Sequence, residues 1–320
     1  MVVVAVAGGT GNLGRTIVEV LKEQGKFEVV VLSRNVKPSQ ETELGVRILP
    51  ADYGSVEALA FTLDSNQVHT VISTINPIVE PSSGAQDGRL APELALIRAA
   101  EKSTTTKRYI PSVWGTRYAK EDTVLFPMAK PRVEARQALE QTSLEHTSVY
   151  NGFFMDYWGH PHIKSYLQPV AFFIDISHNI ANIPGSGDVP IAFTYSFDVA
   201  RFVAGLLTLG NWDKDSFVIG DKITWNDFVQ LAEEIKGTKF RVTYDSVELL
   251  RQGKITELPS HPSLYPFFPK EALQGMAASL GLVLERGSAN FSEEQALNAL
   301  FPEIKTTSVR DLLEKAWSSR

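Results

Sequence analysis

Short apolar runs alternate with longer amphipathic stretches through the first half of the chain. Six runs rich in β-branched residues are typical of strands: Val2–Ala7, Phe27–Leu32, Val46–Leu49, Val68–Ser73, Lys107–Pro111 and Thr147–Asn151. Apolar residues recur at helical spacing between them, in Asn12–Gln24, Ser55–Leu63, Glu93–Lys102 and Pro131–Gln141. Because most of the strand candidates are continuously apolar, we expect helices on both faces of them. The pattern predicts an α/β fold with a doubly wound parallel sheet.

The regular alternation ends near Gly152, where an aromatic-rich segment begins. Later stretches predict helices at Phe197–Leu209, Trp225–Ile235 and Val309–Trp317, and strands at Phe217–Ile219 and Lys239–Val242. Ser308 and Asp311 fit an N-terminal cap of the last helix, and Thr224 opens the middle one. We therefore expect a first domain over residues 1–152 and a smaller part over residues 153–320, with segments that pack back on the sheet.

Composition narrows the classes of function. The chain has 320 residues, of which 43% are hydrophobic, so it can bury a substantial core. Its net charge of −6 argues against nucleic acid as a partner. It has no cysteine, which excludes disulfides and thiolate metal sites. The first apolar run has no basic flank and is too short to cross a bilayer, so we expect a cytoplasmic protein with no membrane partner.

A glycine-rich turn follows the first predicted strand. The sequence Gly8-Gly9-Thr10-Gly11-Asn12-Leu13-Gly14 opens the first helix and spaces three glycines as Gly-x-x-Gly-x-x-Gly. Such a turn brings a bare backbone and the free N–H groups of a helix N-terminus to a diphosphate. Its place within a β-α-β pattern favours dinucleotide binding over a purely structural turn. Residues 1–152 are therefore predicted to form a dinucleotide-binding Rossmann domain.

The end of the second strand bears on which dinucleotide is bound. A carboxylate there binds the adenosine 2′-OH, whereas a cation accepts a 2′-phosphate. This chain has Ser33-Arg34-Asn35 and no acidic residue at that place, which favours NADP(H) over NAD(H). A solvated loop arginine is the alternative interpretation of Arg34. Asp52, after the third strand, is a candidate contact for adenine or a cap for the following helix.

Several segments together resemble one family. They are Gly8–Gly14, Arg34, Arg108–Gly115 and Thr147–Phe153, with weaker matches in Ile183–Asp188 and Phe193–Ala200. With these segments the chain resembles the NmrA-like and isoflavone-reductase-like group of atypical short-chain dehydrogenases/reductases. Plant members read Phe-x-Pro-Ser-Glu-Phe-Gly after the fifth strand, where this chain has Val113-Trp114 in place of Glu-Phe. The resemblance implies a Rossmann fold, an NADP(H) cofactor and reductase activity.

The resemblance also implies a catalytic lysine. The Tyr-x-x-x-Lys pair of typical short-chain dehydrogenases is missing from the expected region, and members of the resembled group use a lysine near the helix between strands five and six. Lys130 is the best match, as a cofactor ligand and as the group that stabilises or protonates the substrate oxygen. An ordinary exposed lysine is the alternative, since Pro131 suggests that the helix begins only after it.

The family's pattern places the ends of strands four, five and six around the nicotinamide. Thr74, Ser112 and Asn151 are the candidate cofactor contacts there, although the two hydroxyls could equally satisfy local backbone. The candidate substrate contacts are aromatic: Trp114, Phe153, Phe154 and Trp158. Consecutive aromatic residues can also fill a core.

Two functions remain open from the sequence. The first is an NADPH-dependent oxidoreductase that reduces a small aromatic or conjugated carbonyl, enone or quinone by hydride transfer. The second is a dinucleotide-sensing regulator without redox turnover that acts through a protein partner. No metal is expected, because Pro161 makes His160-Pro161-His162 a turn and no carboxylate motif accompanies the two histidines.

Overall fold

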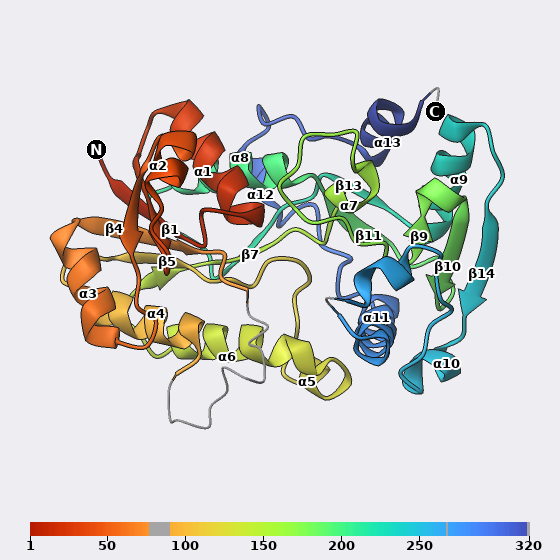
Figure 1. Cartoon of the computed structure of the whole chain (residues 1–320), viewed down its shortest axis with the longest axis horizontal. Coiled ribbons are helices and arrows are strands. Elements are labelled where there is room, and N and C mark those ends of the chain that lie inside the picture. The colour runs from red at the N-terminus through yellow and green to blue at the C-terminus, as the bar shows by residue number, and fades with distance from the viewer. Residues whose placement is uncertain (77–89, 267, 319–320) are drawn as a thin grey trace. The chain divides into compact units, whose positions relative to one another are not determined.

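The fold is built on a six-stranded sheet, seen in a computed structural model that describes residues 1–76, 90–266 and 268–318 (Figure 1). The strands are β1 (Val3–Ala7), β2 (Glu28–Ser33), β3 (Arg47–Pro50), β4 (Val68–Ser73), β5 (Arg108–Ile110) and β6 (Glu145–His146). Their order is β3-β2-β1-β4-β5-β6, and every neighbouring pair is parallel. This is the order of a dinucleotide-binding Rossmann sheet, so the predicted doubly wound fold is confirmed.

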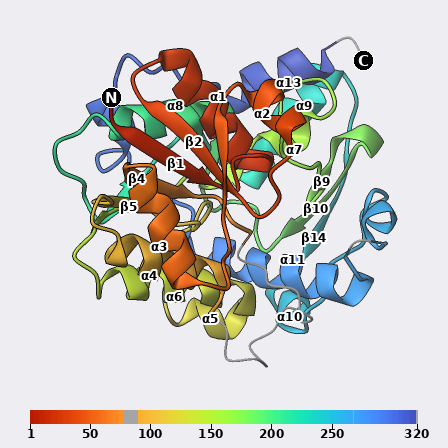
Figure 2. The same ribbon diagram turned by 60° about the vertical axis from the view of Figure 1, so that its left-hand side comes forward.

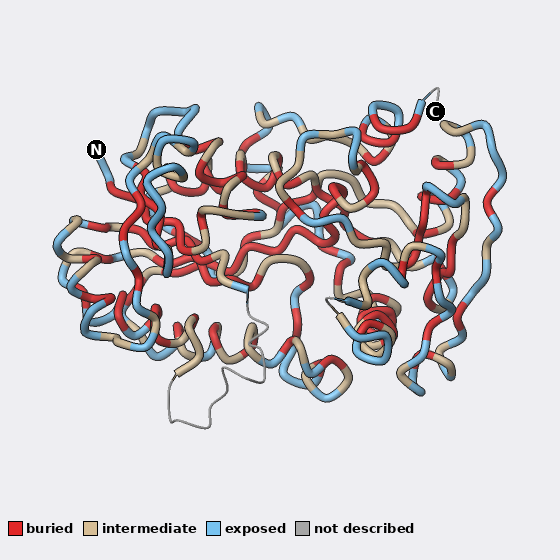
Figure 3. Tube along the Cα trace, viewed as in Figure 1, coloured by how far each residue is buried: buried red, intermediate tan, exposed pale blue. Residues whose placement is uncertain are grey.

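Helices cover both faces of this sheet. They are α1 (Asn12–Gln24), α2 (Pro38–Leu44), α3 (Val56–Ser65), α4 (Pro92–Lys102), α6 (Lys130–Leu139) and α8 (Ser196–Leu206). In both ribbon views α3, α4 and α6 lie on one face, and α1 and α8 lie on the other (Figures 1 and 2). Alternate residues of β1, Val3, Ala5 and Ala7, share a core with α3, α4 and α6. The strands are buried on both sides, as their continuous apolar runs predict (Figure 3).

The prediction of the sixth strand needs correction, and one helix was not predicted. The sixth strand was expected at Thr147–Asn151, but the sheet's edge is β6, and β7 (Ser148–Tyr150) pairs instead with β12 (Asp215–Phe217). The predicted strand thus begins only after β6 has ended, and periodicity cannot detect that the chain has changed its pairing partner there. Helix α2 was not predicted, because it has no buried residue and hence no apolar stripe.

Contacts divide the chain into two compact units. The first comprises Met1–Trp114, Pro131–Tyr150 and Val199–Ser216, and the second comprises Gly115–Lys130, Asn151–Asp198 and Phe217–Arg320. The predicted single boundary after residue 152 differs from this division, because α6, β6, β7 and most of α8 belong with the sheet. Residues far apart in the sequence therefore build each unit.

The second unit contains two small sheets and most of the remaining helices. Its strands are β8 (Phe153–Phe154), β9 (Ile174–Asp175), β10 (Ile180–Pro184), β11 (Ile191–Thr194), β13 (Asp221–Ile223) and β14 (Arg241–Asp245), in the orders β14-β10-β9 and β13-β11-β8. Its helices are α5 (Asp122–Leu125), α7 (Asp156–Gly159), α9 (Trp225–Lys236), α10 (Val247–Arg251), α11 (Lys270–Glu285), α12 (Leu297–Leu300) and α13 (Val309–Trp317). Capping boxes at Thr224 and Ser308 confirm the predicted helix starts. Among the described residues, no helix is both long and apolar enough to cross a membrane.

Candidate functional site

The glycine-rich turn joins β1 to α1 by a short hydrogen-bonded path. Gly8 has a φ of +79°, a left-handed conformation that favours glycine, and its N–H donates to the carbonyl of Leu32 at 3.2 Å. Helix α1 begins at Asn12, and its N-cap is Gly11, which has no side chain to cap it. The helix N-terminus therefore presents N–H groups that no capping side chain occupies.

The glycines at this turn serve different physical needs. A Cβ on Gly14 would collide with the carbonyl oxygen of Gly8 and the hydroxyl of Thr74, so Gly14 is required for close packing of α1. A Cβ on Gly11 would meet no atom within 4 Å. No internal contact explains the glycine at position 11, which leaves the backbone there open to approach by a ligand.

The other predicted residues of the turn differ in what they expose. Asn12 is exposed and Thr10 is half-buried, so the side chains of both can reach a ligand. Leu13 is buried in the core, and only its backbone N–H could contact a cofactor. The structure thus brings Gly8 to Gly14 together as one turn at the carboxyl end of β1.

The end of β2 carries the predicted 2′-phosphate cation. Arg34 is the first residue after the strand and is exposed. The hydroxyl of Ser33 donates to the carbonyl of Asn35 at 2.9 Å, which shapes the loop around the arginine. Burial raises the pKa of Tyr53, three residues beyond β3; Glu93 adds to the rise, and the Arg34 guanidinium opposes it.

Asp52 is not the cap of α3. Its carboxylate accepts the N–H of Gly54 at 2.9 Å, whereas the hydroxyl of Ser55 accepts the N–H of Ala58 at the helix start. The alternative role considered for Asp52 is therefore wrong, and its exposed carboxylate remains a predicted adenine contact.

The ends of β4 and β5 lie next to each other and are bound together. Thr74 donates its hydroxyl to the carbonyl of Ala7 at 2.7 Å, and Ser112 donates its hydroxyl to the carbonyl of Ile75 at 2.7 Å. The indole N–H of Trp114 donates to the carbonyl of Ser73 at 2.9 Å. Both hydroxyls thus satisfy backbone carbonyls, and their oxygens keep lone pairs with which they could accept a bond from a cofactor.

Sequence reasoning missed one residue of this region, Glu93. It lies in the first turn of α4 and is buried, and three donors surround its carboxylate: the hydroxyls of Ser73 and Tyr109 and the N–H of Ser112. Burial raises the pKa of Glu93, and the three hydrogen bonds oppose that rise. An acidic residue in a helix's first turn is ordinarily attributed to the helix dipole, so its pattern gave no signal of burial.

Lys130 and Asn151 belong to the second unit. Lys130 is exposed at the first residue of α6, one residue earlier than Pro131 suggests. Asn151 is fully buried, and its side-chain oxygen accepts the N–H of Gly115 at 3.0 Å. Contact of either residue with a cofactor stays a prediction.

Two of the predicted substrate residues lie in the hydrophobic core of the second unit. Phe153 and Trp158 are 6% and 3% exposed, and their ring centroids lie 5.4 and 5.6 Å from that of Trp225. This is the alternative role noted for consecutive aromatic residues. Phe154 is also buried and contacts the half-buried ring of Tyr157, whereas Trp114 is half-buried.

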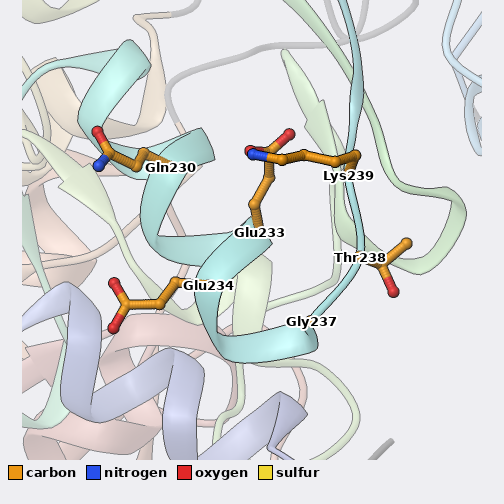
Figure 4. Close-up of a pocket in the computed structure, with 6 residues that line it drawn as sticks. All are labelled: Gln230, Glu233, Glu234, Gly237, Thr238 and Lys239. Carbon is orange, nitrogen blue, oxygen red and sulfur yellow. The ribbon is translucent and has the colours of Figure 1, made fainter.

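A pocket of about 410 Å³ in the second unit lies at the end of α9 and contains none of the predicted residues. It is lined by Gln230, Glu233, Glu234, Gly237, Thr238 and Lys239 (Figure 4). Glu233 and Lys239 point toward each other and form an ion pair at 2.6 Å, and Glu234 pairs with Arg310 at 2.9 Å. Both carboxylates of this pocket thus have a cation of the protein as a partner. Within the described part of the chain, no group of three or more His, Asp or Glu residues could hold a metal ion.

Comparisons with known proteins agree with the resemblance seen in the sequence. The NmrA-like family model matches residues 2–311. Oxidoreductase BOA1 of Botryotinia fuckeliana (strain B05.10) is 35% identical over 307 residues, which cover 95% of this chain and 96% of that protein. Phenylcoumaran benzylic ether reductase TP7 of Nicotiana tabacum is 25% identical, with 97% of each chain covered. The solved structure of AtPrR2 with NADP+ and (+)pinoresinol has a TM-score of 0.71 and 20% identity over 98% of each chain, which supports the fold. The chain belongs to the NmrA-like family.

Proposed function

We propose that the chain is an NADPH-dependent oxidoreductase that reduces a small aromatic or conjugated carbonyl, enone or quinone. Two relatives, the oxidoreductase BOA1 and the benzylic ether reductase TP7, support the reaction class. The NADP+ bound in the AtPrR2 structure supports the cofactor.

Arg34 carries the choice of cofactor. It is an exposed cation at the end of β2, where NAD-binding folds place a carboxylate, and its planar fork suits a 2′-phosphate. The uncapped N-terminus of α1 and the open space beside Gly11 fit the diphosphate of the same molecule. Gly8 to Gly14 would hold the diphosphate, and Arg34 with Ser33 would hold the adenosine phosphate.

Lys130 is the proposed acid. When bound, NADPH supplies the hydride that reduces the substrate. The Lys130 ammonium holds a proton at Nζ and delivers it to the oxygen on which negative charge develops. An aromatic substrate is favoured because AtPrR2 binds pinoresinol and TP7 is a phenylcoumaran benzylic ether reductase. Trp114 and Phe154 are the proposed contacts for that substrate.

A paired titration tests the cofactor. Wild type and Arg34→Gln are titrated with NADPH and NADH, with Arg47→Gln as the control. Arg47 is an exposed arginine at the first residue of β3, opposite Val30 of β2 and so away from the carboxyl ends of the strands, and it pairs with Glu28. We expect Arg34→Gln to weaken NADPH binding about 10- to 150-fold, since a charge-assisted hydrogen bond contributes about 1.5–3 kcal/mol. NADH binding should stay unchanged in both variants. Equal losses for the two dinucleotides would contradict the role of Arg34.

A second experiment tests turnover. The NADPH complex is mixed with a panel of aromatic ketones, enones and quinones while absorbance of the reduced nicotinamide is followed. Oxidation of NADPH by a panel member would support the proposal if Lys130→Ala abolishes it and Lys120→Ala does not. Lys120 serves as the control because it is a second exposed lysine of the same unit. Tight binding without oxidation by any compound would favour the regulator instead.

A further inference from the structure

We propose that Glu93 is a positioning residue that fixes the half of the site that receives the nicotinamide. The inference rests on the proposed NADPH function. Glu93 reaches the carboxyl ends of β4 and β5 from α4, the helix that connects the two strands. No contact of Glu93 with the cofactor is required, because it acts through the two strand ends.

The carboxylate holds both strand ends at once. Its Oε2 accepts the hydroxyl of Ser73, the last residue of β4, at 2.5 Å. Its Oε1 accepts the N–H of Ser112, two residues beyond β5, at 3.1 Å and the hydroxyl of Tyr109 at 3.2 Å. A single side chain therefore bridges Ser73 and Ser112.

These bonds begin where the strand pairing ends. The register of β4 with β5 runs only to Ile72 opposite Ile110. Beyond that pair the ends are joined by side chains: Ser112 to the carbonyl of Ile75, and Trp114 to the carbonyl of Ser73. Glu93 completes this set of bonds, because it orients both serines that take part in it.

Burial of a carboxylate at this position is costly unless hydrogen bonds compensate for the loss of water. The same helix buries Leu96, Ile97 and Ala100 in the core, and burial raises the pKa of the Glu93 carboxyl. Removal of this carboxylate alone would leave its buried donors without an acceptor, which costs stability. The same three bonds define the geometry of the surface that the strand ends form, so Glu93 supports both the fold and that surface.

The strand order of the sheet indicates which half of the dinucleotide lies over the ends of β4 and β5. In the order β3-β2-β1-β4-β5-β6 a dinucleotide lies across the β1/β4 switch point, with its adenosine at the end of β2. The other half of the molecule then lies over the ends of β4 and β5. Glu93 should therefore affect the nicotinamide half and leave the adenosine half unchanged.

Two ligands separate these halves. NADPH contains both halves, whereas adenosine 2′,5′-bisphosphate lacks the nicotinamide, its ribose and the phosphate attached to that ribose. Dissociation constants of both are measured for wild type, Glu93→Leu and Glu93→Gln. We expect Glu93→Leu to weaken NADPH binding at least tenfold and adenosine 2′,5′-bisphosphate binding less than twofold. Glu93→Gln keeps an acceptor oxygen of the same size, so its NADPH affinity should return to within about threefold of wild type.

Thr106→Val is the matched control. Its hydroxyl is also buried and donates to the carbonyl of Val68 at 3.0 Å, at the start of β4, the opposite end of that strand. It should lower stability without changing the affinity for either ligand. If Glu93→Leu does not fold, Tyr109→Phe and Ser73→Ala each remove one donor and should produce a smaller, NADPH-selective loss.

Three results would overturn the inference alone: equal losses for both ligands, no loss for NADPH, or a Glu93→Gln variant as weak as Glu93→Leu. A selective loss of NADPH affinity in Thr106→Val would do the same, because any buried polar group of the sheet would then have this effect. Failure of the wild type to bind adenosine 2′,5′-bisphosphate would overturn the proposed cofactor site, and this inference with it.

Discussion

Replacement of Gly11 by alanine separates ligand binding from stability at the glycine-rich turn. Gly11 has φ and ψ of −152° and 170°, an extended conformation open to any residue, and an added Cβ meets nothing within 4 Å. The remaining cost is that alanine is a poorer N-cap than glycine, about 0.5–1 kcal/mol. We therefore expect Gly11→Ala to fold with nearly wild-type stability.

The same methyl group would lie where a diphosphate must approach the backbone. If it displaces one hydrogen bond from an N–H to the charged diphosphate, the loss is about 1.5–3 kcal/mol. At about 1.4 kcal/mol per factor of ten, the dissociation constant for NADPH should rise about 10- to 150-fold. Gly14→Ala should behave differently, because its Cβ would collide with the carbonyl of Gly8 and the hydroxyl of Thr74. Overpacking of this kind costs about 1–3 kcal/mol, so both stability and binding should fall.

Chemical denaturation and fluorescence titration with NADPH measure the two quantities. Gly275→Ala is the control, because Gly275 lies within α11, its Cβ would also meet open space, and the helix should gain up to about 1 kcal/mol. NADPH affinity in this control should equal that of wild type. A stable Gly11→Ala variant that binds NADPH as tightly as wild type would refute the reasoning, because the open space at Gly11 would then not be where the diphosphate lies.

Two further predictions concern buried polar groups. The carboxylate of Asp156 is fully buried and accepts hydrogen bonds from the hydroxyls of Ser165 and Ser196 and from the N–H of Ser196. Asp156→Ala should therefore lower the free energy of unfolding, measured by urea denaturation, by about 2–4 kcal/mol. A decrease smaller than about 0.5 kcal/mol would contradict this prediction. Burial, followed by the charge of Lys214, lowers the pKa of His146 from 6.5 to about 4. The unfolded chain then binds more protons than the folded one, so stability should decline as the pH falls from 6.5 toward 4, and His146→Gln should flatten that part of the curve. Parallel curves for the two proteins would contradict the shift.

The apolar pattern of the sequence predicted some elements of the fold and some residues of the candidate site, and it failed to predict others. Strand β4 and helices α1 and α13 have the predicted bounds, because each has a strong apolar pattern and clear flanking residues. Helix α2 was missed because no residue of it is buried. The interpretation of Phe153 and Trp158 stayed open because an apolar ring has the same sequence signal in a core as in a binding site.

By itself, the sequence determined the alternation of strands and helices, the glycine turn after β1, the cation after β2 and the resemblance to the NmrA-like family. These are local properties, since each depends on residues a few positions apart. Only the tertiary structure decided that β7 leaves the sheet for β12, that the two units are discontinuous, and that Glu93 meets Ser73 and Ser112. Those features depend on contacts between residues distant in the chain, and the burial that gives the Glu93 carboxylate its role exists only once α4 has packed on the sheet.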